Sequence, residues 1–140
     1  MKVWIAGALA AVLAAGAGWA QGNAPGNAPG NAPGHARAGE GKRVYQRANC
    51  VGCHKWHGDG GGGYGGAALS LRATQLTREQ IVEVVNCGRP TTGMPYHKRG
   101  AYDGDACYGQ TKEALGKDVP AEGATLLRPA EVEAVADYVL

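Results

Sequence analysis

The stretch Cys50-Val51-Gly52-Cys53-His54 decides the fold that this sequence predicts. Two residues separate its cysteines, and a histidine follows the second cysteine directly. This pattern is typical of c-type haem attachment, in which both thiols bond to the porphyrin and the histidine coordinates the iron. The sequence therefore predicts a haem held covalently by Cys50 and Cys53, with His54 as one axial ligand.

A Cys-x-x-Cys pair can instead belong to a zinc or iron-sulfur site, or to a thioredoxin-like redox centre. Two further cysteines, Cys87 and Cys107, could complete a set of four ligands in a structural metal-binding module. Each of them stands alone in the sequence, whereas structural zinc sites usually take cysteines in close pairs. Zinc and disulfide chemistry also have no need of a histidine directly after the second cysteine, so the pattern favours haem.

Apart from Met1, the chain has a single methionine, Met94, which lies between Gly93 and Pro95. A lone methionine often fills a hydrophobic core, but a core residue normally belongs to a periodic apolar segment, and this one does not. The proline restricts Met94 to an extended backbone, and Gly93 permits a close approach of the loop. The loop is therefore suited to aim the thioether at an iron.

These two motifs resemble those of the class I cytochrome c family, whose members carry Cys-x-x-Cys-His near the start and a Gly-Met-Pro-like loop before the last helix. The resemblance covers residues 39–140. It implies an all-α fold, the small cytochrome c fold, in which three to four helices pack around one covalently bound haem c and long irregular loops join them. It also implies that Met94 is the second axial ligand of the iron.

Three segments of this region have helical signals. Residues 40–49 form the first, and Thr77 to Gln80 is a capping box that begins the second, which Gly88 can end. Pro129 lies in the first turn of the third, where proline is favoured. The third helix should bury a stripe formed by Val132, Val135, Ala136 and Val139.

The resemblance also implies contacts around the site. The first and last helices of the family cross near the haem, so Gly41 and Tyr45 should meet Tyr138. Many members have a Gly-Pro-x-Leu step whose carbonyl group holds the proximal histidine. This chain has Gly66-Ala67-Ala68-Leu69 without the proline, so the step does not identify the acceptor, and we expect some backbone carbonyl to serve.

Residues 1–20 have the pattern of a signal peptide, with Lys2 before an uncharged Ala-rich segment and small residues at Gly18 and Ala20. We expect cleavage before Gln21 and export to the periplasm, and a retained membrane anchor is the alternative. Residues 21–38 include three Asn-Ala-Pro-Gly copies that cannot bury apolar surface, and this segment is predicted to be a disordered linker. Residues 39–140 then form one small domain.

Cys87 and Cys107 flank the loop that carries Met94, and they are an even pair in a chain expected to enter an oxidising compartment. We predict a disulfide between them, which would close a loop of about 20 residues and stabilise the fold by roughly 3 kcal/mol. Two unpaired thiols are the alternative.

An iron with His54 and Met94 on its two faces has no open coordination position, so the expected role is single-electron transfer rather than catalysis. We expect a monomer with transient redox partners, such as a periplasmic dehydrogenase, an oxidase or another cytochrome. The formal net charge of +2 gives no sign of nucleic-acid binding. The alternative is a haem enzyme or ligand sensor whose distal side is open, or is assisted or ligated by His57 or His97.

Overall fold

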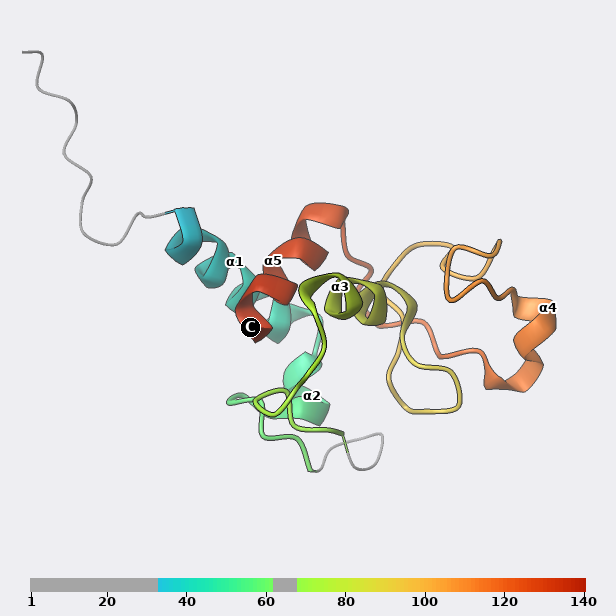
Figure 1. Ribbon diagram of the computed structural model, residues 1–140, viewed down its shortest axis with the longest axis horizontal. Helices are drawn as coiled ribbons and strands as arrows, with labels where there is room; N and C mark the ends of the chain where they lie inside the picture. The colour runs from blue at the N-terminus through green and yellow to red at the C-terminus, as the bar shows by residue number, and fades with distance from the viewer. Residues whose placement is uncertain (1–32, 62–67) are drawn as a thin grey trace, which may run out of the picture.

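The computed structural model describes residues 33–61 and 68–140, with side chains from residue 37 onward. This part of the chain contains helices and no strand, which confirms the all-α prediction (Figure 1). Its elements are α1 (Pro33–Arg47), α2 (Cys50–His54), α3 (Arg78–Cys87), α4 (Lys112–Leu115), the 3₁₀ helix η1 (Gly116–Asp118) and α5 (Pro129–Val139). Over the same ranges, no helix has the length and hydrophobicity needed to cross a membrane.

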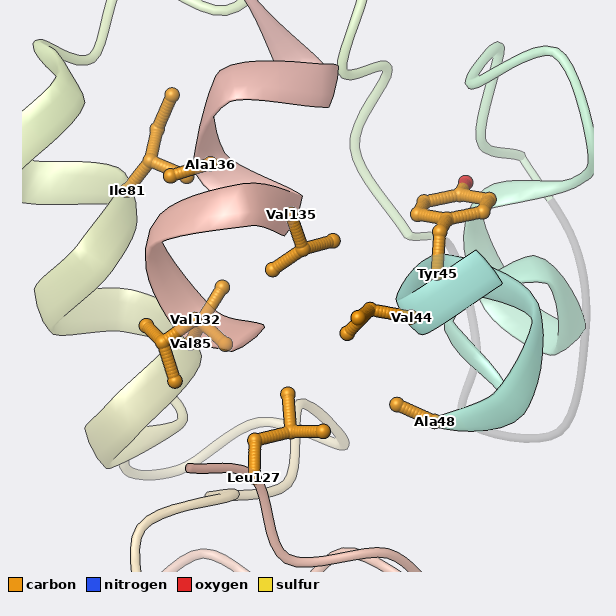
Figure 2. Packing of buried hydrophobic residues seen from close by; sticks show 9 residues of the cluster. All are labelled: Val44, Tyr45, Ala48, Ile81, Val85, Leu127, Val132, Val135 and Ala136. Atoms are coloured by element: carbon orange, nitrogen blue, oxygen red, sulfur yellow. The ribbon is translucent and has the colours of Figure 1, made fainter. Parts of the chain in front are cut away.

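Helices α1 and α3 both pack on α5, and together the three form the main core. Figure 2 shows α5 in the middle, with Val135 directed toward Val44 of α1, while Ile81 and Val85 of α3 approach α5 from its other side. Burying an aliphatic side chain of this size contributes about 1.5–3 kcal/mol. The whole buried cluster is Val44, Tyr45, Ala48, Ile81, Val85, Leu127, Val132, Val135 and Ala136.

The crossing of α1 and α5 has the contacts that the sequence analysis expected. A Cβ atom on Gly41 would overlap the carbonyl oxygen of Ala134 and would lie 2.5 Å from the Cβ of Tyr138. The ring centroids of Tyr45 and Tyr138 are 5.5 Å apart, within the range for favourable aromatic pairs. Glycine at position 41 therefore lets the two helix backbones approach closely.

The start of α1 corrects the predicted boundary between linker and domain. The helix begins at Pro33, so residues 33–38, which were assigned to the disordered linker, are helical. Proline suits the first turn of a helix, and alanine and arginine in the following residues are good helix formers. Arg37 also reaches α5, where its guanidinium lies 3.8 Å from the carboxylate of Asp137. The signal-peptide prediction and the rest of the linker prediction lie outside the described residues.

The signals for α3 and α5 are confirmed. The hydroxyl of Thr77 accepts a hydrogen bond from the backbone of Gln80, whose side chain accepts one from the backbone of Thr77. Gly88 ends α3 with φ of 65°, a conformation that favours glycine. Pro129 lies in the first turn of α5, and the backbone N–H of Arg128 donates to the Glu131 side chain.

A second, smaller core is formed mainly by the part of the chain that follows Met94 and precedes α5. It contains the disulfide between Cys87 and Cys107, whose Cα atoms are 5.5 Å apart, and α4 and η1 flank it. We call residues 96–123 the lobe; it lies at the end of the molecule away from α1 (Figure 1). The buried residues of this core are Cys87, Tyr96, Ala101, Tyr102 and Cys107, packed against Leu115 and Val119.

Candidate functional site

The residues that the sequence analysis assigned to the haem surround one cavity of about 410 Å³. Cys50, Cys53 and His54 of α2 line it together with Met94, although the loop of Met94 is far from α2 in the sequence. A largely apolar cavity of this size is typical of sites for small organic ligands and cofactors. The apolar part of its wall includes Leu69, Leu71, Leu76, Ile81, Val84, Val85, Val135 and Val139.

Helix α2 is little more than one turn long, and this length brings its three functional residues together. Residues three and four apart are neighbours on a helix, so the side chains of Cys50, Cys53 and His54 lie on one side of the turn. Positive φ angles of 60° at Asn49 and Lys55 separate α2 from the chain on both sides. The hydroxyl of Tyr45 donates a 2.7 Å hydrogen bond to the carbonyl of Lys55, which ties the end of the turn to α1.

The imidazole of His54 is fixed by a backbone carbonyl. Its Nδ1 lies 3.0 Å from the oxygen of Leu69, and because a carbonyl only accepts hydrogen bonds, Nδ1 carries the proton. The lone pair of Nε2 is then available for a metal. Burial lowers the pKa of His54, the hydrogen bond to Leu69 opposes this, and the charge of Arg89 lowers it further, so the site favours the neutral ring.

The sequence left open which carbonyl accepts the hydrogen bond of His54. The structure identifies it as the carbonyl of Leu69, the last residue of the Gly-Ala-Ala-Leu step. Gly60 allows the segment that carries Leu69 to approach, because a Cβ atom there would lie 2.7 Å from the carbonyl carbon of Leu69. Gly60 also has φ of 69°, and the N–H of Gly61 donates a 2.8 Å hydrogen bond to the carbonyl of Ala68. Part of the glycine-rich loop thus holds the partner of the histidine.

Met94 is held at the cavity by its backbone. The N–H of Arg89 donates to the carbonyl of Met94 at 3.1 Å, and the N–H of Met94 donates to the hydroxyl of Thr92 at 3.2 Å. A Cβ atom on Gly88 would lie 2.7 Å from the carbonyl oxygen of Met94. The end of α3 and the methionine therefore touch through their main chains.

The four cysteines divide into two pairs. Cys87 and Cys107 are joined to each other, whereas Cys50 and Cys53 are free thiols beside the cavity. Burial raises the pKa of the Cys50 thiol to about 11. Within residues 33–61 and 68–140, no group of three or more His, Cys, Asp or Glu side chains is placed to hold a metal ion. The arrangement therefore does not favour a metal module built from four cysteines.

The two histidines considered for the distal side lie in different places. His57 is outside the cavity, with its Nδ1 2.8 Å from the carboxylate of Asp59. His97 lines the cavity and is only 2% exposed, and its Nδ1 lies 2.8 Å from the carbonyl of Thr125. Of these two, only His97 has access to the site.

Arg89 is a cavity residue to which the sequence analysis gave no role. In the part of the chain that the structure describes, it is the one Lys or Arg side chain in the cavity wall. The sequence feature that could have identified Arg89 is its position directly after Gly88, between the end of α3 and the methionine loop. The guanidinium brings positive charge to a mainly apolar wall.

Comparison with known families gives a result that bears on this cavity. A family model described as cytochrome C oxidase, cbb3-type, subunit III matches residues 36–108, just over half of the chain. The matched range contains α2, α3, all four cysteines and Met94. No curated protein and no solved structure matches the chain.

Proposed function

The chain belongs to this family of c-type cytochromes, and from that premise we propose that it carries single electrons between redox proteins of the periplasm. The observation that carries the proposal is the convergence of Cys50, Cys53, His54 and Met94 on one apolar cavity. One haem c would be held there, through thioethers to the two cysteines and through His54 and Met94 on the two faces of the iron.

The residues present fit this cofactor. Two thiols and an imidazole lie within the five residues of α2, and a thioether comes from a separate loop of the same cavity. When bound, haem c supplies an iron that gains and loses one electron. The carbonyl of Leu69 orients the His54 ring and keeps its proton on Nδ1, which leaves Nε2 for coordination.

Electron transfer is favoured over catalysis because His54 and Met94 together would leave no position for a substrate. A methionine ligand also raises the reduction potential relative to two imidazoles. The alternative of a His-ligated or open distal side is supported by His97, because this residue lines the same cavity. The carbonyl of Thr125 holds Nδ1 of His97 as the carbonyl of Leu69 holds Nδ1 of His54. Nε2 of His97 is therefore also available, and the Met94 variant below distinguishes the two ligands.

The partners we propose are proteins that meet this one transiently, through small interfaces. A dehydrogenase is the proposed donor, and an oxidase or another cytochrome is the proposed acceptor. Lys98 and Arg99 are exposed beyond Met94 and would attract an acidic partner surface. Residues 1–20 are proposed to direct export and then to be removed, which leaves a monomer. If this segment were kept instead, it would anchor the protein to the membrane.

The test compares the purified protein with two variants. We expect His54→Ala to prevent accumulation of the haem-loaded protein, and Met94→Ala to retain covalent haem at a lower reduction potential. Met94→Ala should also lose the weak long-wavelength absorption band that methionine-bound ferric haem gives. An unchanged spectrum and potential in Met94→Ala, or carbon monoxide binding to the reduced wild-type protein, would decide for the enzyme or sensor.

A further inference from the structure

The lobe provides hydrogen-bond partners for the last carbonyl groups of α3. These groups have no partner inside the helix, so something else must satisfy them. The backbone N–H of His97 donates to Val85 at 3.1 Å, and that of Lys98 donates to Asn86 at 3.1 Å. The next two carbonyls along the chain are bound by tyrosine side chains rather than by backbone.

Two tyrosine hydroxyls bind these consecutive carbonyl groups. Tyr102 donates to the carbonyl of Cys87 at 2.7 Å, and Tyr108 donates to that of Gly88 at 2.7 Å. Tyr102 is only 1% exposed, so its hydroxyl and the carbonyl of Cys87 have little access to water as a replacement partner. Tyr108 adopts φ of 57°, which is uncommon for a tyrosine, where the chain turns after Cys107.

The residues held in this way are the ones that touch the methionine. Gly88 packs its main chain against the carbonyl of Met94 and the backbone of Pro95, which leaves no room for a Cβ atom. The N–H of Arg89 donates to the same carbonyl of Met94. A displacement of Cys87 and Gly88 would therefore be passed directly to Met94.

We infer that Tyr102 and Tyr108 are positioning residues for Met94, whose hydroxyls fix the end of α3 and so keep the thioether on the iron. The inference rests on the proposed function, because it takes Met94 to be an axial ligand. Neither tyrosine lines the cavity, so each acts through the end of α3, Tyr102 at Cys87 and Tyr108 at Gly88. The lobe then serves as a clamp on the distal ligand, in addition to its contribution to stability.

The test measures how readily added imidazole displaces Met94 from the ferric holoprotein. The variants are Tyr102→Phe and Tyr108→Phe, which remove one hydroxyl each and keep the ring. Losing a hydrogen bond of ordinary strength should raise the affinity for imidazole about fivefold in each variant. The detachment rate of Met94, read as the limiting rate at saturating imidazole, should rise in the same direction.

Tyr138→Phe is the matched control, because the Tyr138 hydroxyl makes no hydrogen bond within the described residues. It should bind imidazole as the wild-type protein does. Thermal unfolding of every variant separates positioning from stability alone: lower stability with unchanged imidazole affinity in both variants overturns the inference. Should Tyr102→Phe fail to accumulate, the partly exposed Tyr108 still gives the decisive measurement.

The wild-type spectrum distinguishes the two possible failures. If the wild-type ferric protein lacks the band of methionine ligation, the proposed ligand set is wrong and the inference falls with it. If the band is present and both variants bind imidazole like the wild type, Met94 remains the ligand and the tyrosine clamp is refuted.

Discussion

Gly41 lies directly against Ala134 where α1 crosses α5, and a Cβ atom on Gly41 would overlap the carbonyl oxygen of Ala134. Substituting Gly41→Val should push the helices apart and lower the free energy of unfolding by about 2–3 kcal/mol, as overpacking does in other cores. Chemical denaturation of the haem-loaded protein measures the loss. Gly39→Ala, two residues earlier in open space, should instead stabilise the helix by about 0.5–1 kcal/mol. Equal stabilities for the two variants would contradict the close approach.

Glu131 of α5 makes two ion pairs that respond to pH, one with Arg47 of α1 and one with Arg128 at the start of α5. Its carboxylate lies 2.6 Å from Arg47 and 3.0 Å from Arg128. Hydrogen bonds from the side chain and backbone of Arg128, with a further one from Arg47, lower the pKa of Glu131 to about 2 from its ordinary 4.5. A lowered pKa means that this carboxylate stabilises the fold above pH 4.5, and that the contribution is lost as pH falls toward 2.

The variant Glu131→Gln should therefore be less stable than the wild type at pH 7, by about 2 kcal/mol for a charged hydrogen-bonded group. The difference should shrink as the pH falls below 4.5. Unfolding curves taken from pH 7 down to pH 2 give the comparison. Glu83→Gln is the control: Glu83 is exposed and has no ion pair within the described residues, so the pH profile should keep its shape. A parallel profile for Glu131→Gln would argue against the ionised carboxylate as the cause.

The disulfide should stabilise the fold because it restricts the conformations that the unfolded chain can adopt. The double substitution Cys87→Ser, Cys107→Ser should lower the free energy of unfolding by about 3 kcal/mol, since the bond closes a loop of 20 residues. It should also weaken the methionine absorption band, because α3 then loses its covalent link to the lobe. Ala106→Ser, at an exposed neighbouring position, adds a hydroxyl without breaking the bond and should leave both measurements unchanged. An intact band in the double variant would show that Met94 does not depend on the bridge.

The capping box of α3 gives a prediction that is independent of the site. Thr77→Ala removes the hydroxyl that accepts the N–H of Gln80 and should cost about 1 kcal/mol. Thr77→Ser keeps the hydroxyl and should retain most of that stability. Thermal unfolding separates the two, and equal losses would mean that the methyl group matters more than the cap.

Features that depend on neighbouring residues were predictable from the sequence. The turn from Cys50 to His54, the cap at Thr77 and the proline at the start of α5 each act over a few residues, so their signals are local. The resemblance supplied the long-range contact between Tyr45 and Tyr138. The start of α1 was misplaced because the repeats before it have the composition of a linker, and composition carries no information on the pair between Arg37 and Asp137.

The sequence could not predict the acceptor for His54 or the contacts of Tyr102 and Tyr108 with α3. The physical reason differs from that for the start of α1. Leu69 offers a main-chain carbonyl, and every residue has one, so no side-chain pattern marks it. Tyr102 and Tyr108 lie in an irregular segment without periodicity, and their partners are also carbonyl groups. Such contacts depend on how distant segments fold back on each other.

The two pairs of cysteines in this chain need opposite oxidation states while the protein matures. The proposed thioethers need Cys50 and Cys53 as reduced thiols when the cofactor is attached, whereas Cys87 and Cys107 must each give up a hydrogen to an oxidant. Folding helps to separate the two chemistries, because the bonded pair is only 3% and 0% exposed. Once the lobe has closed, a reductant serving the attachment turn has little access to the bridge, so lobe closure and cofactor attachment can proceed in one compartment.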